Sequence, residues 1–417
     1  MPRQPRRVSC RTGTGDASLL RILYLVPSLA DPAVARRVAM LRLGGAEVEI
    51  AGFRRADAPP DSLPAGTVVE LDVTHDGRML QRLFATLTAV FRARGWARSF
   101  ARPDVIIARN LEMLGIANRL LGFWPQPPAL VYECLDIHRL MLRQDNLGRS
   151  MRLVEQRLSR SAALLLTSSP AFLENYFAQH GSPPPYLIEN KVFAPEGLDI
   201  GDNPALRGDI EPIRIGWFGA LRCHKSLAAL DAASRALDGR IEVTLRGRPA
   251  LTEFEDFAAT TEAAPHLRYA GPYRYPHDLA AIYSDVHFVW AIDFFEEGQN
   301  SRWLLPNRIY EGCLNGAIPI ALAGTETAAF IERLGIGLVI PDIETETLTA
   351  LFSALAPERL LALAQAVQAQ DPATFRCEKA ECVALVDRLA DLAPASLEKA
   401  AALASSSSCP RSTRAAI

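Results

Sequence analysis

Basic side chains follow a glycine-containing apolar run in the second half of the chain. The run and its loop read GWFGALRCHKS and carry Gly219, Arg222, His224 and Lys225 ahead of a helical segment. Glycine lets the backbone approach a ligand closely, and a helix N-terminus with added Arg and Lys attracts anions. The segment therefore predicts a cradle for a diphosphate. The alternative is a plain strand–helix turn with solvated basic residues.

A second polar segment in the same half combines amide, guanidinium and carboxylate groups. An apolar run, VHFVWAID, leads into a polar loop, and Pro306 then opens a helix. A carboxylate that faces a cleft can accept hydrogen bonds from both hydroxyls of a ribose, whereas a surface pair between Arg308 and Glu311 would contribute only about 0.3–0.5 kcal/mol. With the first loop, this segment predicts a nucleotide-diphosphate donor site. Its candidate donor-binding residues are Asn300, Ser301, Asn307, Arg308 and Glu311.

Polar residues also follow two apolar runs in the first half. The run in LVYECLDIHR contains Glu133 and is followed by Asp136 and His138, while another run ends at Arg109 and Asn110. Parallel strands meet a cleft at their carboxyl ends, so Asp136 or His138 could orient an acceptor hydroxyl or take its proton. We predict that Arg109, Asn110 and Glu133 contact the acceptor. The alternatives are a structural histidine and a capped turn.

Alternating strand and helix patterns predict the frame that positions these residues. Short apolar runs separated by amphipathic segments are typical of parallel sheets covered on both faces. The sequence therefore predicts an α/β protein with two Rossmann-like, doubly wound domains facing a cleft. The predicted divisions are a disordered lead-in at 1–20, a first domain at 21–195, a linker at 196–212, a second domain with a closing helix at 213–393, and a disordered tail at 394–417.

Composition and missing motifs exclude several function classes. The 417 residues are 49% hydrophobic with a formal net charge of −2, so we expect no nucleic-acid partner. The glycine fingerprint GxGxxG does not follow the first strand, and the phosphate loop GxxxxGK[ST] and a DxD triplet do not occur. We therefore expect neither a nicotinamide cofactor nor a bound metal.

The remaining patterns concern location. Seven scattered cysteines without zinc spacing favour reduced thiols, and neither a secretory signal nor an uninterrupted apolar span is recognised. We expect a cytoplasmic protein. The stretch from Arg78 to Arg102 lacks acids and interleaves arginines with apolar residues at helical spacing. It fits a helix lying on the anionic inner face of a membrane and equally a core-packed helix with a solvated basic face.

The two second-half motifs together resemble a known family. GWFGALRCHKS paired with LPNRIYEGCLNGAIPIA resembles the donor domain of GT-B glycosyltransferases, and more narrowly family four in its bacterial exopolysaccharide, succinoglycan-type branch. VYECLDIH in the first half is similar to the same branch, and the likeness covers roughly residues 20–350. It implies a metal-independent, retaining hexosyltransferase. The implied substrates are a nucleotide sugar and a growing, lipid-linked saccharide acceptor.

The resemblance assigns roles residue by residue. Lys225 matches the family's donor-phosphate lysine, Glu311 matches the glutamate that binds the donor's ribose, and Pro306 and Arg308 match the P-x-K/R positions before it. Replacing Lys225 or Glu311 with alanine is then expected to lower transfer at least ~100-fold.

Three positions depart from the family pattern. Ala220 stands where the phosphate arginine usually follows the glycine, so Arg222 is the candidate substitute. The first glutamate of the E-x7-E pair would fall at Trp303, which cannot replace it, and the usual histidine would fall near Leu135, three residues before His138. The alternatives to a transferase are a nucleotide-sugar epimerase of the same fold and a non-catalytic polysaccharide-assembly partner.

Overall fold

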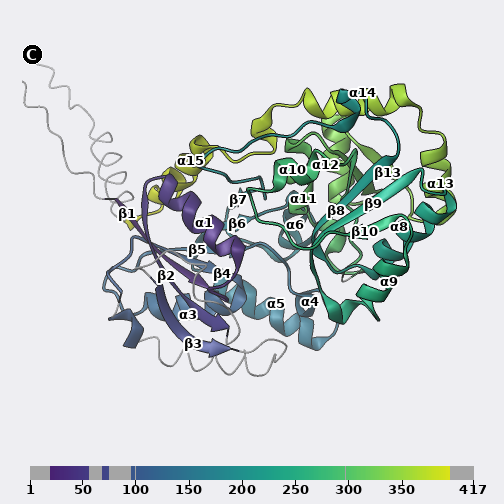
Figure 1. Cartoon of the computed structure of the whole chain (residues 1–417). Coiled ribbons are helices and arrows are strands. Elements are labelled where there is room, and N and C mark those ends of the chain that lie inside the picture. The colour runs from purple at the N-terminus through teal and green to yellow at the C-terminus, as the bar shows by residue number, and fades with distance from the viewer. Residues whose placement is uncertain (1–18, 56–67, 75–94, 99, 296, 395–417) are drawn as a thin grey trace, which may run out of the picture.

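Two parallel sheets form two domains that face each other (Figure 1). The computed structural model describes residues 19–55, 68–74, 95–98, 100–295 and 297–394. All pairings between the described strands are parallel. The strand order is β3-β2-β1-β4-β5-β6-β7 in the first sheet and β10-β9-β8-β11-β12-β13 in the second. Each order reverses direction once, as in a doubly wound fold, and confirms the predicted fold class.

The described strands lie close to the predicted apolar runs. The first sheet contains β1 (Leu20–Val26), β2 (Ala46–Arg55), β3 (Val68–Thr74), β4 (Val105–Arg109), β5 (Ala129–Cys134), β6 (Ala162–Thr167) and β7 (Pro185–Leu187). The second sheet contains β8 (Ile213–Leu221), β9 (Ile241–Pro249), β10 (Leu267–Tyr269), β11 (Phe288–Trp290), β12 (Ile318–Leu322) and β13 (Leu338–Ile340).

Helices connect these strands and cover the sheets. The first domain has α1 (Pro32–Leu43), α3 (Asn110–Leu121), α4 (Arg139–Leu142), α5 (Asn146–Ser159), α6 (Pro170–Phe172) and α7 (Ala178–His180). The second domain has α8 (His224–Ala236), α9 (Phe257–Ala263), α10 (Leu279–Tyr283), α11 (Asn307–Leu314), α12 (Glu326–Leu334), α13 (Thr345–Ser353) and α14 (Pro357–Gln368). The last described helix is α15 (Lys379–Ala390).

Local chemistry explains where α1 begins and ends. The Asp31 side chain accepts a hydrogen bond from the backbone N–H of Ala33, Pro32 occupies the first helical position, and Gly44 follows the last. A capping carboxylate and a first-turn proline both favour a helix start at this point. The helix thus begins directly after β1, at the carboxyl edge of the first sheet, where its first turn can contribute side chains to the cleft.

The closing helical stretch, predicted as part of the second domain, is divided between the domains. Helix α14 packs in the second-domain core, but α15 packs on α1 and places Cys382, Leu385 and Leu389 in the core of the first sheet. A break at Asp371 and a short 3₁₀ turn separate the two helices. The correction follows from the apolar face of α15, which is complementary to the first sheet although its place in the sequence follows the second domain.

The predicted linker, residues 196–212, packs against the second domain. Asn203 is fully buried, and its side-chain amide donates to the carbonyls of His287 and Gly316 at 2.9 Å each. The crossings between domains lie instead at Val192 and Arg376, which form a parallel bridge. The chain therefore passes between the domains twice, side by side.

Length and apolar composition decide whether any of the described helices could cross a membrane. None of these helices alone has the length and apolar composition to cross a bilayer; α13 and α14 meet that test only when combined, across a bend of 97°. The predicted disordered ends and the basic segment from Arg78 lie almost wholly outside the described residues.

Candidate active site

A cavity of about 550 Å³ opens at the carboxyl edge of the second sheet. It is bounded by the ends of β8, β11 and β12 and by the first turns of α11. Six of the eight predicted donor-site residues line it; they are Gly219, Arg222, Ser301, Asn307, Arg308 and Glu311. Gly219 adopts a positive φ of 106°, a conformation that favours glycine, at the point where β8 meets the cavity.

Glu311 projects into this cavity from a buried position on α11. Its Oε2 accepts hydrogen bonds from the hydroxyls of Tyr283 at 3.1 Å and Tyr273 at 3.4 Å. Burial raises the pKa of Glu311 above its ordinary value, while Tyr283, Arg308 and Arg36 oppose this rise. Oε1 is the acceptor of no hydrogen bond from the described residues, so the carboxylate retains capacity for a ligand hydroxyl.

Two guanidinium groups share one carboxylate in the same cavity. Asp293 accepts a hydrogen bond from Arg222 Nε at 3.1 Å, and its Oδ2 lies 3.8 Å from Arg308 Nη2. The other oxygen of Asp293 is held by the backbone N–H of Phe295 at 2.9 Å, and Arg222 stacks on the Phe295 ring at 4.4 Å. Asp293 thus holds one side of each guanidinium group, and the remaining N–H groups can donate hydrogen bonds to a ligand.

Arg308 has a nitrogen available for a hydrogen bond to an anion. Its Nη1 is buried and finds no hydrogen-bond partner in the described part of the chain, although buried guanidinium nitrogens are usually satisfied. Arg308 forms its ion pair with Asp293 rather than with Glu311, so the predicted alternative of a surface pair between Arg308 and Glu311 is not what the structure shows. Asp293 ends the apolar run VHFVWAID, but the sequence alone did not indicate that it binds the two arginines.

Lys225 lies beside the cavity rather than in its wall. Helix α8 begins at His224, so Lys225 occupies the first turn and not the loop before the helix as predicted. Its side chain is 45% exposed, and its ammonium forms an ion pair with Glu297, which does line the cavity. Sequence reasoning missed Glu297, which precedes Gly298 in the loop after β11.

The predicted residues Asn300 and Asp136 meet across the two domains. The Asn300 side-chain amide donates to Asp136 Oδ1 at 2.6 Å and to the Ile137 carbonyl at 2.8 Å. Asn300 is therefore engaged in contact between the domains and does not line the donor cavity. His138 is exposed, and its Nδ1 accepts a hydrogen bond from the Leu140 N–H at the start of α4. Asp136 thus lies at the domain boundary, His138 follows two residues later, and their role on the acceptor side stays a prediction.

The first domain also contributes to the donor cavity. Asn190, which lines it, accepts a hydrogen bond from Arg36 Nη2 at 3.0 Å and donates to the Leu305 carbonyl at 3.3 Å. Arg36 comes from α1 and Leu305 from the loop before α11. Trp303 in that loop packs on the first-domain core, so the position where the family's first glutamate would fall lies outside the cavity wall.

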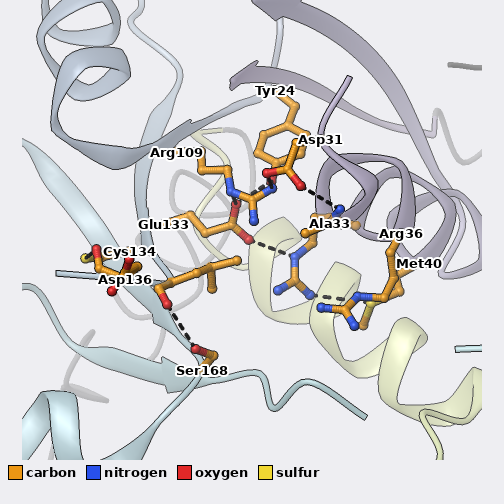
Figure 2. Close-up of polar contacts among 12 residues, drawn as sticks. Tyr24, Asp31, Ala33, Arg36, Met40, Arg109, Glu133, Cys134, Asp136 and Ser168 are labelled. Atoms are coloured by element: carbon orange, nitrogen blue, oxygen red, sulfur yellow. Dashed lines mark hydrogen bonds and ion pairs between the residues drawn. The ribbon is translucent and has the colours of Figure 1, made fainter. Parts of the chain in front are cut away.

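A buried polar cluster occupies the carboxyl edge of the first sheet (Figure 2). Glu133 is 0% exposed; it accepts hydrogen bonds from Tyr24 and from Arg37 Nε, the latter at 2.8 Å, and lies 3.7 Å from Arg109 Nε. Arg109 is also buried and lies 3.6 Å from the partly exposed Asp31. These partners enclose Glu133 and leave it no exposed surface for a saccharide acceptor. The prediction that Glu133 contacts the acceptor is therefore corrected: the residue orients Arg37 and Arg109.

Asn110 follows Arg109 in an unusual backbone conformation. Its φ of 68° lies in the left-handed region, which asparagine tolerates better than most residues, at the first position of α3. Strained residues of this kind cluster at functional sites. Asn110 therefore remains a candidate for acceptor contact, with Arg109 held behind it.

The Glu133 cluster gives a stability prediction. Replacing Arg37 with methionine removes the nearest cation from a fully buried carboxylate, and we expect the free energy of unfolding at neutral pH to fall by about 3–5 kcal/mol. Urea unfolding followed by fluorescence measures it. The double variant Arg37→Met, Glu133→Gln should recover part of the loss, because the buried carboxylate is gone while buried Arg109 keeps only Asp31 as its partner. A single variant as stable as the wild type would contradict the assignment.

The same cluster predicts a pH dependence. Burial acts to raise the pKa of Glu133, but Arg37, Arg109 and the Tyr24 hydroxyl outweigh it and hold the pKa below its ordinary value. A carboxylate with a lower pKa in the folded protein stabilises the fold above its unfolded pKa, and this contribution is lost as the pH falls through the folded pKa.

Comparisons with known proteins identify the family of this chain. Residues 30–188 match the family described as Glycosyl transferase 4-like domain. The succinoglycan biosynthesis protein ExoL of Rhizobium meliloti (strain 1021) is 48% identical over 379 residues, which cover 90% of this chain and 94% of that protein.

Solved structures share the fold at low sequence identity. The sucrose-phosphate synthase of Thermosynechococcus elongatus superposes with a TM-score of 0.63 at 13% identity, over 89% of this chain and 99% of that one. Anabaena Alr3699/HepE in complex with UDP and glucose superposes with a TM-score of 0.59 at 16% identity, over 88% and 98% of the two chains.

Proposed function

The chain belongs to the glycosyl transferase 4-like family and is a glycosyltransferase of the GT-B fold, and on that premise we propose that it transfers a hexose from a nucleotide-diphosphate sugar to a growing, lipid-linked saccharide. The relative's role in succinoglycan biosynthesis supports an exopolysaccharide as the product. UDP and glucose in the HepE structure make UDP-glucose the first donor to test.

One observation carries the donor proposal: the Nη1 of buried Arg308 has no hydrogen-bond partner in the part of the chain that the structure describes, and Arg308 lines the same cavity as Arg222 and Glu311. A diphosphate would supply acceptor oxygens for both guanidinium groups, and a ribose would supply hydroxyls for the open oxygen of Glu311. The cavity lies at the carboxyl edge where the strand order reverses between β8 and β11, the usual place for a nucleotide in such sheets.

The proposed mechanism follows from the charges that develop during transfer. Breaking the sugar–phosphate bond leaves positive charge on the sugar and negative charge on the diphosphate. We propose that Arg222 and Arg308 stabilise the leaving diphosphate without a metal, with each preorganised donor worth ~3–4 kcal/mol of the barrier. The acceptor hydroxyl would approach from the side of Asp136 and His138. Retention by attack on the same face, assisted by the leaving phosphate, is the stereochemical course implied by the family.

Calorimetry with a panel of nucleoside diphosphates tests the donor site. We expect one base to bind well above the others and its sugar conjugate to be consumed only when a saccharide acceptor is present, with or without a chelator. Consumption of the donor without an acceptor would favour the epimerase alternative. Failure of every nucleoside diphosphate to bind would overturn the donor proposal.

The ion pair between Lys225 and Glu297 allows two variants that should change diphosphate affinity in opposite directions. To act as the family's phosphate lysine, Lys225 must leave Glu297. Because its side chain is nearly half exposed, we expect Lys225→Ala to weaken nucleoside-diphosphate binding about ten-fold, less than the family resemblance alone implies. Glu297→Gln frees the ammonium and should strengthen the binding of the same diphosphate. Equal weakening in both variants would show that the ion pair itself, and not the free lysine, supports the site.

We also propose a peripheral position on the inner face of a membrane. The basic segment from Arg78 to Arg102 supports it by composition, but lies mostly outside the described residues. Reversing Arg78, Arg82 and Arg92 to glutamate is expected to weaken sedimentation with anionic vesicles, and unchanged sedimentation would remove this segment from the proposal.

A further inference from the structure

Helix α5 buries the carboxylate of Glu155 and leaves three of its large apolar side chains exposed. Its buried side chains include Glu155 and Ser159, and Glu155 accepts hydrogen bonds from the hydroxyls of Tyr132 at 2.7 Å and Tyr176 at 2.5 Å. Met151 and Leu158 pack against the core of the first domain, so part of the apolar surface of α5 is buried in the ordinary way. The other large apolar residues of the helix remain exposed and are available for another contact.

The outward face of α5 holds three large apolar side chains within eight residues. Leu147 is 49% exposed, Leu153 is 64% exposed and Val154 is 47% exposed. Only ten large apolar residues are exposed in the whole described part of the chain, so this helix holds three of them. Single exposed leucines are common on protein surfaces, but a group on one helix marks an interaction surface.

Arginines surround these apolar residues without matching acids. Arg149, Arg157 and Arg160 are exposed on the same helix or at its end. The acids of α4, α5 and their connection are Asp145 and Glu155: Asp145 caps α5 and pairs with Arg143, and Glu155 is turned inward. The exposed face of α5 is therefore both apolar and positively charged.

This surface lies next to the acceptor side of the cleft. Helix α4 begins directly after His138, and α4 and α5 pack against each other where the two domains meet (Figure 1). Asp136, two residues before His138, contacts Asn300 of the second domain. A partner bound to the outward face of α5 would therefore lie close to the mouth through which an acceptor enters.

We propose that the outward face of α5 docks on the surface of an anionic lipid bilayer. Arginines bind the headgroups while Leu147, Leu153 and Val154 enter the boundary with the acyl chains, the arrangement by which amphipathic helices bind membranes. A protein partner fits less well because the face lacks the tyrosine and tryptophan anchors that dominate protein interfaces. The inference rests on the proposed function for the acceptor alone: a bilayer bound to α5 would hold a lipid-linked acceptor beside Asp136 and His138.

Vesicle sedimentation of the full chain tests the proposal. We expect the wild type to sediment with vesicles of phosphatidylglycerol and phosphatidylcholine, but not with phosphatidylcholine alone. The charge variant Arg149→Glu, Arg157→Glu and the apolar variant Leu153→Ser, Val154→Ser should each weaken binding by roughly 30-fold or more. High salt should weaken the wild type and leave the charge variant little changed, because screening acts on the headgroup attraction.

Matched variants on the second domain serve as controls. Arg268→Glu with Arg359→Glu makes the same charge change at exposed positions, and Leu251→Ser removes an apolar side chain that is 69% exposed. These controls should bind vesicles as the wild type does. The proposal would be overturned if the α5 variants bound vesicles as well as the wild type, or if the wild type did not bind vesicles. A wild-type dimer that dissociates in the α5 variants would also overturn it. Calorimetry with the nucleoside diphosphate separates this result from a failure of the donor site, which lies in the other domain.

Discussion

Alanine in place of Glu311 is expected to lower the kcat/KM for sugar transfer at least ~100-fold. The carboxylate is buried at the wall of the donor cavity, and the hydroxyls of Tyr283 and Tyr273 hold it in one orientation. Its removal takes away the acceptor for the ribose hydroxyls and leaves both tyrosine hydroxyls without their partner. Steady-state kinetics with the identified donor measures the loss, and the binding of the free diphosphate should weaken in parallel because the ribose is common to both.

Glu311→Gln separates the charge from the shape of the side chain. Because burial raises the pKa of Glu311, the ionised form that accepts two hydroxyls should be gained as the pH rises through that pKa, and wild-type donor affinity should rise with it. The Gln variant should bind weakly with no such dependence. Wild-type turnover in both variants, at unchanged thermal stability, would dismiss the ribose role.

The sequence predicted the second-domain site better than the first-domain site, for a physical reason. The residues after β8 and at the start of α11 follow signals that are local in the chain: a glycine at the end of a strand, basic residues at a helix start, and a proline before Arg308 and Glu311. Such residues reach the cavity wherever the strand and helix form. In the first domain, Glu133 belongs to a cluster with Tyr24, Arg37 and Arg109 whose members lie up to 109 positions apart in the sequence. No local pattern shows that these side chains meet.

Asp293 and α15 show what a sequence pattern leaves open. Asp293 was visible as an acid at a strand end, but its role depends on Arg222 and Arg308, which come from two other elements. The apolar face of α15 indicated a buried helix without indicating which sheet would cover it. In both cases the element was predictable and its partner was not, because the partner is set by packing between distant parts of the chain.

Hydrogen bonds connect the two domains beside the donor cavity, in addition to the two places where the chain crosses between them. Asn300 reaches Asp136 from the second domain, and Arg36 reaches the donor cavity through Asn190 from the first. The loop that carries Asn300 also contains Ser301, which lines the cavity. Donor binding and contact between the domains therefore depend on the same short loop, and both should be considered when a variant of this loop is interpreted.

Replacement of Arg308 by alanine is expected to have the largest effect on turnover, a fall in kcat of ~10²–10³. Arg308 lines the cavity, its guanidinium is buried beside Asp293, and its Nη1 has no hydrogen-bond partner among the described residues. We expect that group to meet charge that grows on the diphosphate as the sugar departs, so its loss should lower kcat more than it raises KM. Arg308→Lys keeps the charge but loses the planar fork that joins Asp293, the Ala220 carbonyl and the ligand, so it should restore only part of the activity.

Arg302→Ala is the matched comparison for this experiment. Arg302 also lines the cavity, but its side chain is exposed at the rim, where water already solvates the charge. Electrostatic stabilisation is stronger in a buried, preorganised site than at an exposed one, so the loss at Arg302 should be clearly smaller than at Arg308. An equal loss in kcat for both variants would show that net positive charge alone supports the reaction. A fall confined to KM in Arg308→Ala would assign the residue to donor binding and remove it from stabilisation of the leaving group.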